Sequence, residues 1–231
     1  MRLTIRADDL GWDVKQPDKI DRGLSLARRF HDAMQGVPYL GAVIPSCVDA
    51  DGRAWLRSRP KGLTVAMHGV THNMVSPGVE SEFAGLTRTK CMVMIGSGQR
   101  RLGVPTQHFV APFNHYGEFL GDALADCGII YHWYGDTPEQ EPMPPKRSER
   151  FVWIPVWRPL YGMTAWRVAD DRPSILDVLA GLNGSIQSAI VTLHITWEAA
   201  FPPEFDGVRE FVKTYGQHVI TPDEYVGKCF K

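Results

Sequence analysis

Two acidic residues and two histidines stand out in this sequence as a possible metal-binding and catalytic group. Asp8 and Asp9 follow an apolar run, and His68 and His72 lie four residues apart in His68-Gly69-Val70-Thr71-His72. Together they could supply an Asp-His-His set of metal ligands with one carboxylate left over. A divalent metal can polarise water and a carbonyl group while the spare carboxylate takes the proton, so the set predicts a metal-dependent hydrolase.

Each half of this set also has an ordinary structural explanation. The chain has eight histidines, so a pair with this spacing can arise by chance as solvated or capping residues. Asp8-Asp9 could be a helix cap beside a surface residue. Two adjacent carboxylates at a strand end nevertheless repel each other, and a divalent cation relieves that repulsion.

Size and composition restrict the class of protein. The chain has 231 residues and a net charge of −1, which fits one domain and offers no basic run for nucleic acid. No segment has the roughly 20 apolar residues of a spanning helix, and the N-terminus lacks the apolar stretch of a signal peptide. The scattered cysteines contain no C-x-x-C pair, which predicts reduced thiols in a cytoplasmic protein. They are Cys47, Cys91, Cys127 and Cys229.

Apolar runs alternate with segments of helical periodicity along the whole chain. We expect strands at residues 3–7, 40–44, 63–67, 108–111, 129–131, 151–156 and 189–193. We expect helices at residues 18–34, 117–127 and 173–187, one that starts at Ser76-Pro77 and runs through Phe83 and Met94, and one that opens at Thr221. Such alternation predicts an α/β fold with a mostly parallel sheet, as a barrel or doubly wound.

The polar residues that follow the expected strands favour the barrel. Asp8-Asp9, His68, Ala111-Pro112 and His194 each come after a different strand. In a (β/α) barrel the carboxyl ends of the strands meet at one mouth, where the active site lies. We therefore expect these residues to converge.

Four motifs in the same order resemble those of the polysaccharide deacetylase superfamily, the NodB-homology or family 4 carbohydrate esterases. They are Arg6-Ala7-Asp8-Asp9-Leu10-Gly11, His68-Gly69-Val70-Thr71-His72, Phe109-Val110-Ala111-Pro112-Phe113 and Ile190-Val191-Thr192-Leu193-His194. The first is also similar to the related YdjC-like sugar deacetylases. The resemblance implies a distorted (β/α) barrel of mostly parallel strands, with residues 1–231 as a single catalytic domain.

The resemblance also implies a role for each matching residue. Asp9, His68 and His72 would bind the metal, Asp8 would be the general base, and His194 would be the general acid. The residues themselves agree with this chemistry, because three protein ligands leave an open position, as in catalytic zinc sites. A protonated His194 could donate to the leaving amine, although a buried imidazole bonded to a carbonyl group is the structural alternative.

Two departures from the family pattern concern the mechanism. The family carries an arginine that holds the catalytic aspartate, and the matching position here is Val110. Arg6, Asn114 or Arg158 could replace it. The family motif that lines the pocket with an aspartate and a tryptophan has no clear match, and Trp133 and Asp136 are the nearest candidates.

The remaining candidates concern substrate binding: Pro112, Asn114, Trp133 and Trp157. Aromatic rings stack on the apolar faces of sugars, but core packing is an equal alternative for each tryptophan. Asn114 follows the turn at Pro112 and could equally belong to the surface.

The sequence predicts a hydrolase that removes an N-acetyl or N-formyl group from a sugar in a glycan or glycan precursor. The substrate would be an acetylated amino sugar of cell-surface polysaccharide biosynthesis, such as that of lipopolysaccharide. Zn²⁺ is the expected metal, and cobalt, nickel or manganese would fit the same ligands. The alternatives are a carbohydrate-binding protein that has lost turnover and an O-acetyl esterase.

Overall fold

The computed structural model describes residues 2–11, 24–73, 82–114, 117–135, 146–156, 160–161, 188–195 and 205–229. The chain divides into two compact units, which we call unit 1 and unit 2. Unit 1 consists of Met1–Gly41, Pro60–Thr64 and Pro159–Lys231, and unit 2 consists of Ala42–Arg59 and Val65–Arg158.

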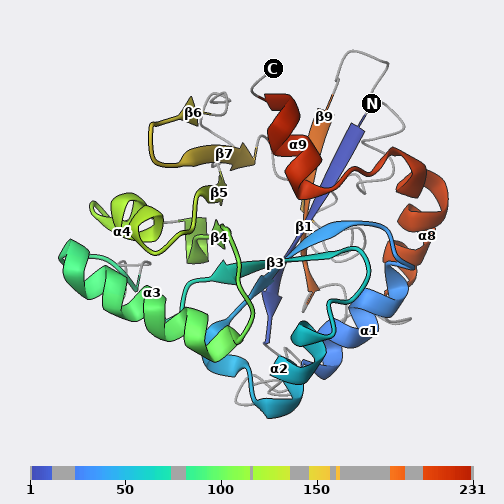
Figure 1. Ribbon diagram of the computed structural model, residues 1–231. Coiled ribbons are helices and arrows are strands. Elements are labelled where there is room, and N and C mark those ends of the chain that lie inside the picture. Colours follow the sequence, from blue (N-terminus) through green and yellow to red (C-terminus); the bar gives the residue numbers. More distant parts are fainter. Residues whose placement is uncertain are drawn as a thin grey trace. The chain divides into compact units, whose positions relative to one another are not determined.

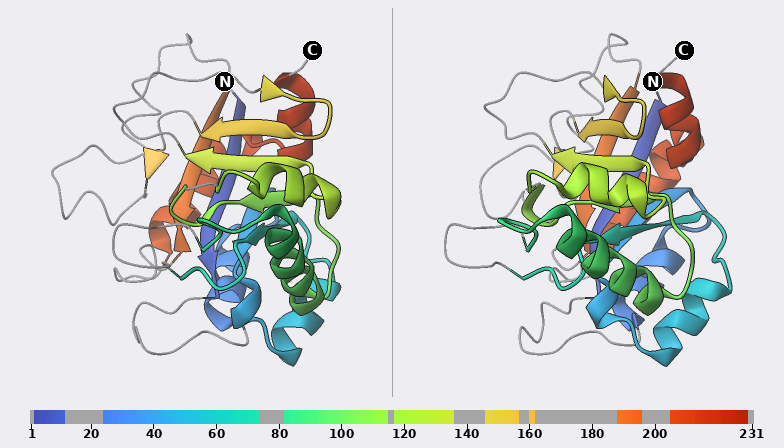
Figure 2. Two further views of the ribbon diagram at one scale, coloured as in Figure 1. Left: turned by 90° about the vertical axis from the view of Figure 1, so that its left-hand side faces the viewer. Right: turned by 60° about the vertical axis from the view of Figure 1, so that its left-hand side comes forward.

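Unit 1 is built on parallel strands and three described helices. Its elements are β1 (Arg2–Leu10), α1 (Ser25–Ala33), β8 (Leu160–Tyr161), β9 (Ser188–His194), α8 (Asp206–Tyr215), the 3-10 helix η3 (Gly216–His218) and α9 (Pro222–Cys229). β9 pairs in parallel with β1 and with β8. The views in Figures 1 and 2 show β1 and β9 side by side along their length.

An apolar stripe places α1 in the core of unit 1. Leu26, Phe30 and Ala33 recur at helical spacing and are buried, which stabilises the helix by removing apolar surface from water. The Phe30 ring packs edge-on against Tyr39 and Phe205, with ring centroids 5.4 and 5.6 Å away.

Unit 2 carries its own parallel strands. Its elements are the 3-10 helices η1 (Pro45–Cys47) and η2 (Pro112–Asn114), the helices α2 (Ala50–Arg57), α3 (Arg88–Leu102) and α4 (Leu120–Asp126), and the strands β4 (His108–Val110), β5 (Tyr131–Gly135), β6 (Lys146–Arg147) and β7 (Val152–Val156). The strands β2 (Tyr39–Val43) and β3 (Leu63–His68) contribute residues to both units. β3, β4, β5 and β7 pair in parallel in that order, and β6 is antiparallel to β7.

The helices α3 and α4 lie against each other in unit 2 (Figure 1). Gln99 of α3 donates a hydrogen bond to the carbonyl oxygen of Cys127 at 2.9 Å. Asp126 forms ion pairs with both Arg88 and Arg150. These contacts hold α3 against α4 and the segment that follows α4.

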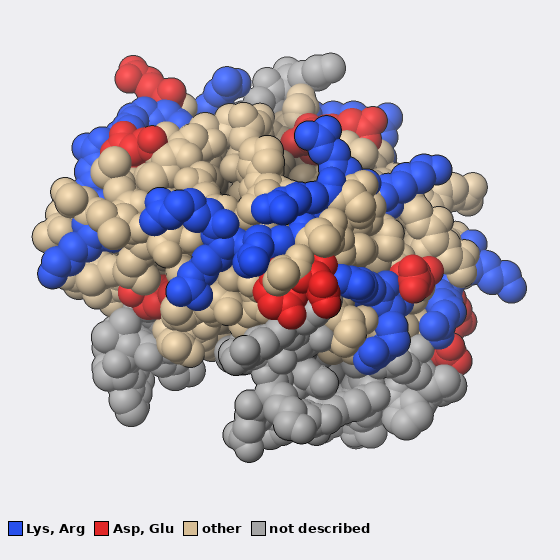
Figure 3. Space-filling model, turned by 60° about the horizontal axis from the view of Figure 1, so that its bottom comes forward, with Lys and Arg blue, Asp and Glu red and all other residues tan. Residues whose placement is uncertain are grey.

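Among the described residues the strand order is β1-β9-β8 in unit 1 and β6-β7-β5-β4-β3 in unit 2. The expectation of a mostly parallel sheet is confirmed by the pairings. No helix in the described part of the chain is long and apolar enough to cross a membrane. On the face shown in Figure 3, acidic side chains lie among the basic ones.

Some expected boundaries are wrong. Part of the helix expected from Ser76 through Phe83 and Met94 lies outside the described residues, which include neither Ser76 nor Pro77. Phe83 itself lies in a turn, and α3 begins at Arg88, because Thr87 caps it and Gly85 turns the chain with a φ of 68°. The strand expected at residues 129–131 is β5, Tyr131–Gly135. We did not predict α8, and the helix expected at residues 173–187 falls outside the described residues.

Candidate metal and catalytic site

Arg6 and Asp8 form a buried ion pair within one strand. Residues two apart in a strand project from the same face, and here both side chains are nearly inaccessible, at 2% and 3%. Arg6 Nε lies 3.0 Å from Oδ1 and 3.1 Å from Oδ2 of Asp8, and Nη2 lies 2.6 Å from Oδ2. A buried carboxylate needs such compensation. Arg6, one of the three candidates, thus holds Asp8; the side chain of Asn114 and all of Arg158 lie outside the described residues.

His194 lies beside Asp8 in the same unit. The parallel register of β1 and β9 pairs Asp8 with His194 and Arg6 with Thr192. Paired residues of parallel strands project from the same face of the sheet, so the two predicted catalytic side chains are neighbours at the carboxyl ends of their strands. His194 is half-buried, which leaves it partly accessible.

Asp9 departs from the strand conformation of its neighbours. It is only 8% exposed, and its φ of 65° is in the left-handed region. This conformation costs free energy for a residue with a Cβ, although aspartate tolerates it better than most. Strain of this kind persists where surrounding structure imposes it, and it concentrates at functional sites.

The two histidines of unit 2 lie close together and are buried. His68 ends β3, and His72 follows with a left-handed φ of 59°. Their ring centroids are 4.6 Å apart. Nδ1 of His68 lies 3.0 Å from the carbonyl oxygen of Val110. Since a carbonyl can only accept, Nδ1 carries the proton, and Nε2 keeps the lone pair that a metal requires.

The segment between the histidines is held by Glu82. One carboxylate oxygen accepts from the Val70 N–H at 2.6 Å. The other accepts from the Thr71 N–H at 2.9 Å and the Thr71 hydroxyl at 2.8 Å. Sequence reasoning missed Glu82, because nothing in its spacing from the histidines signals the contact.

Asp9, His68 and His72 form the predicted ligand group. All three are buried, and each offers a ligand atom within 4.8 Å of the others. One carboxylate and two imidazoles suit zinc and leave an open coordination position. The donor types, the burial and the tautomer of His68 therefore all fit a divalent metal.

Several solved structures share the fold of this chain. A 4-alpha-glucanotransferase from Thermococcus litoralis matches with a TM-score of 0.63 and 14% identity over 98% of this chain, which spans 38% of that protein. A family 4 acetyl xylan esterase from Clostridium thermocellum, in complex with a cobalt ion, matches with a TM-score of 0.58 and 14% identity over 98% of this chain and 90% of that one. A chitin deacetylase from Colletotrichum lindemuthianum matches with a TM-score of 0.55 and 14% identity over 99% and 85% of the two chains.

The fold is a distorted (β/α) barrel. The expected fold class is thus confirmed. The sequence matches no protein-family model and no curated protein, so the likeness lies in the three-dimensional structure. At such low identity the likeness shows the fold, and the function depends on the residues of the site.

The predicted substrate-binding residues have mixed outcomes. Pro112 is buried in η2. Trp133 is completely buried, and its indole N–H donates to Nδ1 of His108 at 3.0 Å, which is a core-packing role; sugar contact by Trp133 stays a prediction. The side chain of Asn114 and all of Trp157 lie outside the described residues, as does Asp136.

One buried histidine outside the ligand group shows the effect of burial alone. His132 stacks on Phe151 with ring centroids 4.7 Å apart. Burial lowers its pKa to about 4, against a smaller opposing effect of its hydrogen bond to Ile129. A neutral imidazole packed in this way fits a structural role.

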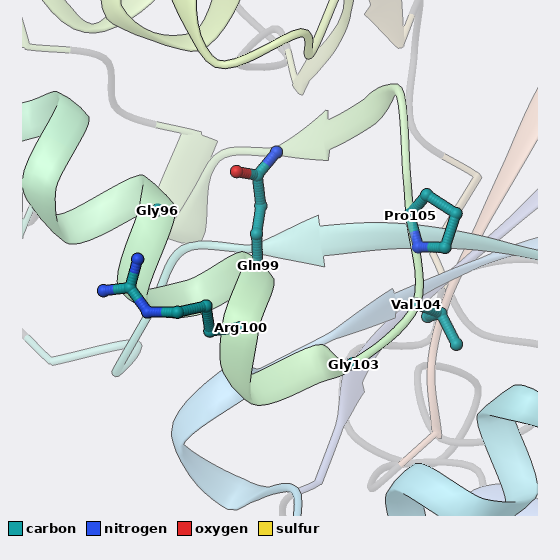
Figure 4. Close-up of a pocket in the computed structure, with 6 residues that line it drawn as sticks. All are labelled: Gly96, Gln99, Arg100, Gly103, Val104 and Pro105. Carbon is teal, nitrogen blue, oxygen red and sulfur yellow. The ribbon is translucent and has the colours of Figure 1, made fainter.

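An open cavity of about 400 Å³ lies away from the histidines of unit 2. Figure 4 shows its lining residues, Gly96, Gln99, Arg100, Gly103, Val104 and Pro105. They end α3 and lead into the start of β4, whereas His68 pairs with Val110 at the far end of β4. We therefore do not assign this cavity to the substrate.

Proposed function

We propose that this chain is a metal-dependent hydrolase that removes an N-acetyl or N-formyl group from a sugar in a glycan or glycan precursor. One observation carries the proposal: the ligand atoms of Asp9, His68 and His72, all buried, lie within 4.8 Å of one another. A carboxylate and two imidazoles whose ligand atoms lie this close together suit one divalent cation, which can bind all three at once.

The metal would be held by Asp9, His68 and His72, with the lone pair of His68 Nε2 directed by the bond from Nδ1 to Val110. When bound, a divalent ion supplies Lewis acidity for a water molecule and for the carbonyl oxygen of the acyl group. We expect the bound ion to be Zn²⁺, and cobalt, nickel and manganese would fit the same three ligands.

The protons are moved by residues of unit 1. In our proposal a carboxylate oxygen of Asp8 accepts the proton of the attacking water, and the Arg6 guanidinium fixes that carboxylate in one orientation. His194, paired with Asp8 across the ladder, donates a proton from its ring to the leaving nitrogen. An amine leaves poorly without such a proton.

Loss of catalysis is the weaker alternative. The valine at position 110 favours a binding protein only if Asp8 lacks an arginine. Arg6 supplies that arginine from within β1, with both carboxylate oxygens bonded. This contact supports the hydrolase over a protein that only binds carbohydrate.

An O-acetyl esterase is the second candidate function. The acetyl xylan esterase that shares the fold, in complex with a cobalt ion, favours it. The two reactions differ in the leaving group, since an alcohol needs less help from His194 than an amine does. An esterase should cleave aryl acetates rapidly, and a strict amide hydrolase should be slow on them.

The proposal is tested with purified protein, its metal content and a panel of N-acetylated amino sugars. Wild type should contain about one divalent ion and release acetate. Asp8→Asn should keep the metal and lower kcat by about 10²–10⁴-fold, because it removes the general base. Asp9→Ala should lose the metal.

Asp122→Asn is the matched control, because Asp122 forms an exposed ion pair with Arg150. It should change neither metal content nor turnover. Metal-loaded wild type that releases no acetate from any amino sugar would count decisively against the proposal. Cytoplasmic location and a part in cell-surface polysaccharide biosynthesis stay predictions from the sequence.

A further inference from the structure

The segment that joins His68 to His72 is anchored by a carboxylate that the proposed reaction does not use. Glu82 accepts three hydrogen bonds, from the backbone N–H groups of Val70 and Thr71 and from the Thr71 hydroxyl, at 2.6, 2.9 and 2.8 Å. Hydrogen bonds to an ionisable carboxylate are stronger than bonds between neutral groups. Glu82 is 7% exposed, so water competes little for these donors.

The same segment is enclosed on its other sides. The Ser46 N–H donates to the carbonyl oxygen of Val70 at 2.9 Å. At Gly69, whose φ is 60°, an added Cβ would overlap Glu82 Oε1 and come within 2.5 Å of Pro112 Cγ. Glycine is therefore required for the carboxylate to approach the backbone so closely.

This anchoring determines the position of His72. His72 directly follows Thr71, and its left-handed φ of 59° is a conformation that surrounding contacts must impose. Without the Glu82 bonds, the Val70 and Thr71 amides would gain freedom, and the ring of His72 would sample positions away from His68.

We infer that Glu82 is a positioning residue, which holds the histidine segment ready for a metal ion; this inference rests on the proposed function. Glu82 is not itself a ligand in this scheme, because both of its oxygens accept bonds from Val70 and Thr71. Groups that orient metal ligands typically contribute 10–100-fold to metal affinity.

The test is Glu82→Gln, in which one carboxylate oxygen becomes an NH₂ group that cannot accept from an N–H donor. Co²⁺ binding to the metal-free full chain is measured by visible absorption, together with amide hydrogen exchange at Val70 and Thr71. We expect Co²⁺ affinity to fall by roughly 10–100-fold and exchange at both amides to accelerate.

Two further variants separate positioning from general stability. Asp126→Asn breaks ion pairs with Arg88 and Arg150 elsewhere in unit 2 and should lower thermal stability without changing Co²⁺ affinity. Glu82→Asp keeps the charge on a shorter side chain and should fall between wild type and Glu82→Gln. If Glu82→Gln does not fold, Glu82→Asp replaces it in the same Co²⁺ and hydrogen-exchange measurements.

The outcomes distinguish the two proposals. If wild type and the foldable Glu82 variant bind Co²⁺ equally well, the positioning role is wrong and the proposed function stands. If wild type takes up no Co²⁺, the proposed function fails, and the inference fails with it.

Discussion

The carboxylate side and the histidine side of the candidate site are positioned by different physical means. On the carboxylate side, Asp8 and His194 lie opposite each other in a regular parallel ladder, and Arg6 holds Asp8 from within the same strand. On the histidine side, His68 leaves its strand at Gly69, and the chain reaches His72 through a segment held by Glu82.

The two sides are therefore sensitive to different substitutions. A ladder distributes its hydrogen bonds over many residues, so its geometry survives the loss of one side chain. The buried charge of Asp8, by contrast, is paired with Arg6 among the described residues. The histidine segment has the opposite character: its backbone geometry depends on one carboxylate and on close packing from α3. Substitutions can therefore separate the two.

The largest effect on stability should come from the carboxylate side. Arg6→Met leaves Asp8 buried without its charged partner, and we expect a loss of about 3–5 kcal/mol in the free energy of unfolding. Chemical denaturation measures it. Adding Asp8→Asn should recover part of that loss, because the uncompensated charge is removed.

Arg209→Met provides the matched control in the same unit. Arg209 pairs with Asp206 at the surface, where the side chains are 47% and 57% exposed, so the loss should stay below about 1 kcal/mol. An equally small loss for Arg6→Met would show that Asp8 does not depend on Arg6.

The sequence predicts the carboxylate side better than the histidine side. The apolar alternation of β1 and β9 and the polar residues at their ends are local signals, and so is the capping box of α9, in which Thr221 and Glu224 exchange hydrogen bonds. The register that pairs Asp8 with His194 is not local. From the sequence, Arg6 is one of three candidates for holding Asp8. The period of two in a strand already places Arg6 on the same face as Asp8.

The Glu82 anchor could not be predicted, because it depends on tertiary folding. No pattern connects a glutamate to backbone amides 11 and 12 residues earlier. The start of α3 at Arg88 has a local cause, the cap by Thr87. The sequence contains a second helix-start signal, Ser76-Pro77, and local patterns alone do not decide between the two. Trp133 shows the same limit, since composition cannot tell a buried tryptophan from one that meets a sugar.

Packing from α3 provides a way to disturb the histidine side. A Cβ on Gly98 would lie 2.8 Å from Met67 Sδ and 3.2 Å from Val70 Cγ2. Gly98→Ala should therefore push on the segment that Glu82 holds, and we expect a loss of about 1–3 kcal/mol together with weaker Co²⁺ binding. Denaturation and Co²⁺ titration measure the two effects.

Gly96→Ala tests the same substitution two residues earlier in α3. Among the described residues its Cβ would meet Arg100 Nη1 alone, at 3.5 Å, so alanine should raise the free energy of unfolding by about 0.5–1 kcal/mol through its helix propensity. If both variants behaved alike, close packing against Val70 would not matter for the histidine side.

The smallest effects come from one conservative change made on each side. Thr4 lies in β1, fully buried, and its hydroxyl has no hydrogen-bond partner within the described structure. Thr4→Val removes that polar group while keeping the shape, and should raise the free energy of unfolding by about 1 kcal/mol. Thr71→Val removes a hydroxyl that donates to Glu82 at 2.8 Å, and should lower the free energy of unfolding by about 1–2 kcal/mol.

The two threonine variants should also differ in Co²⁺ binding, which only Thr71→Val should weaken. Thr71→Ser keeps the hydroxyl and should restore most of the affinity, because the bond to Glu82 can form again. A stability change of the same sign in Thr4→Val and Thr71→Val would remove the distinction between the two sides. Opposite signs would show that the buried Thr4 hydroxyl lowers the free energy of unfolding, whereas the Thr71 hydroxyl raises it and helps to hold His72.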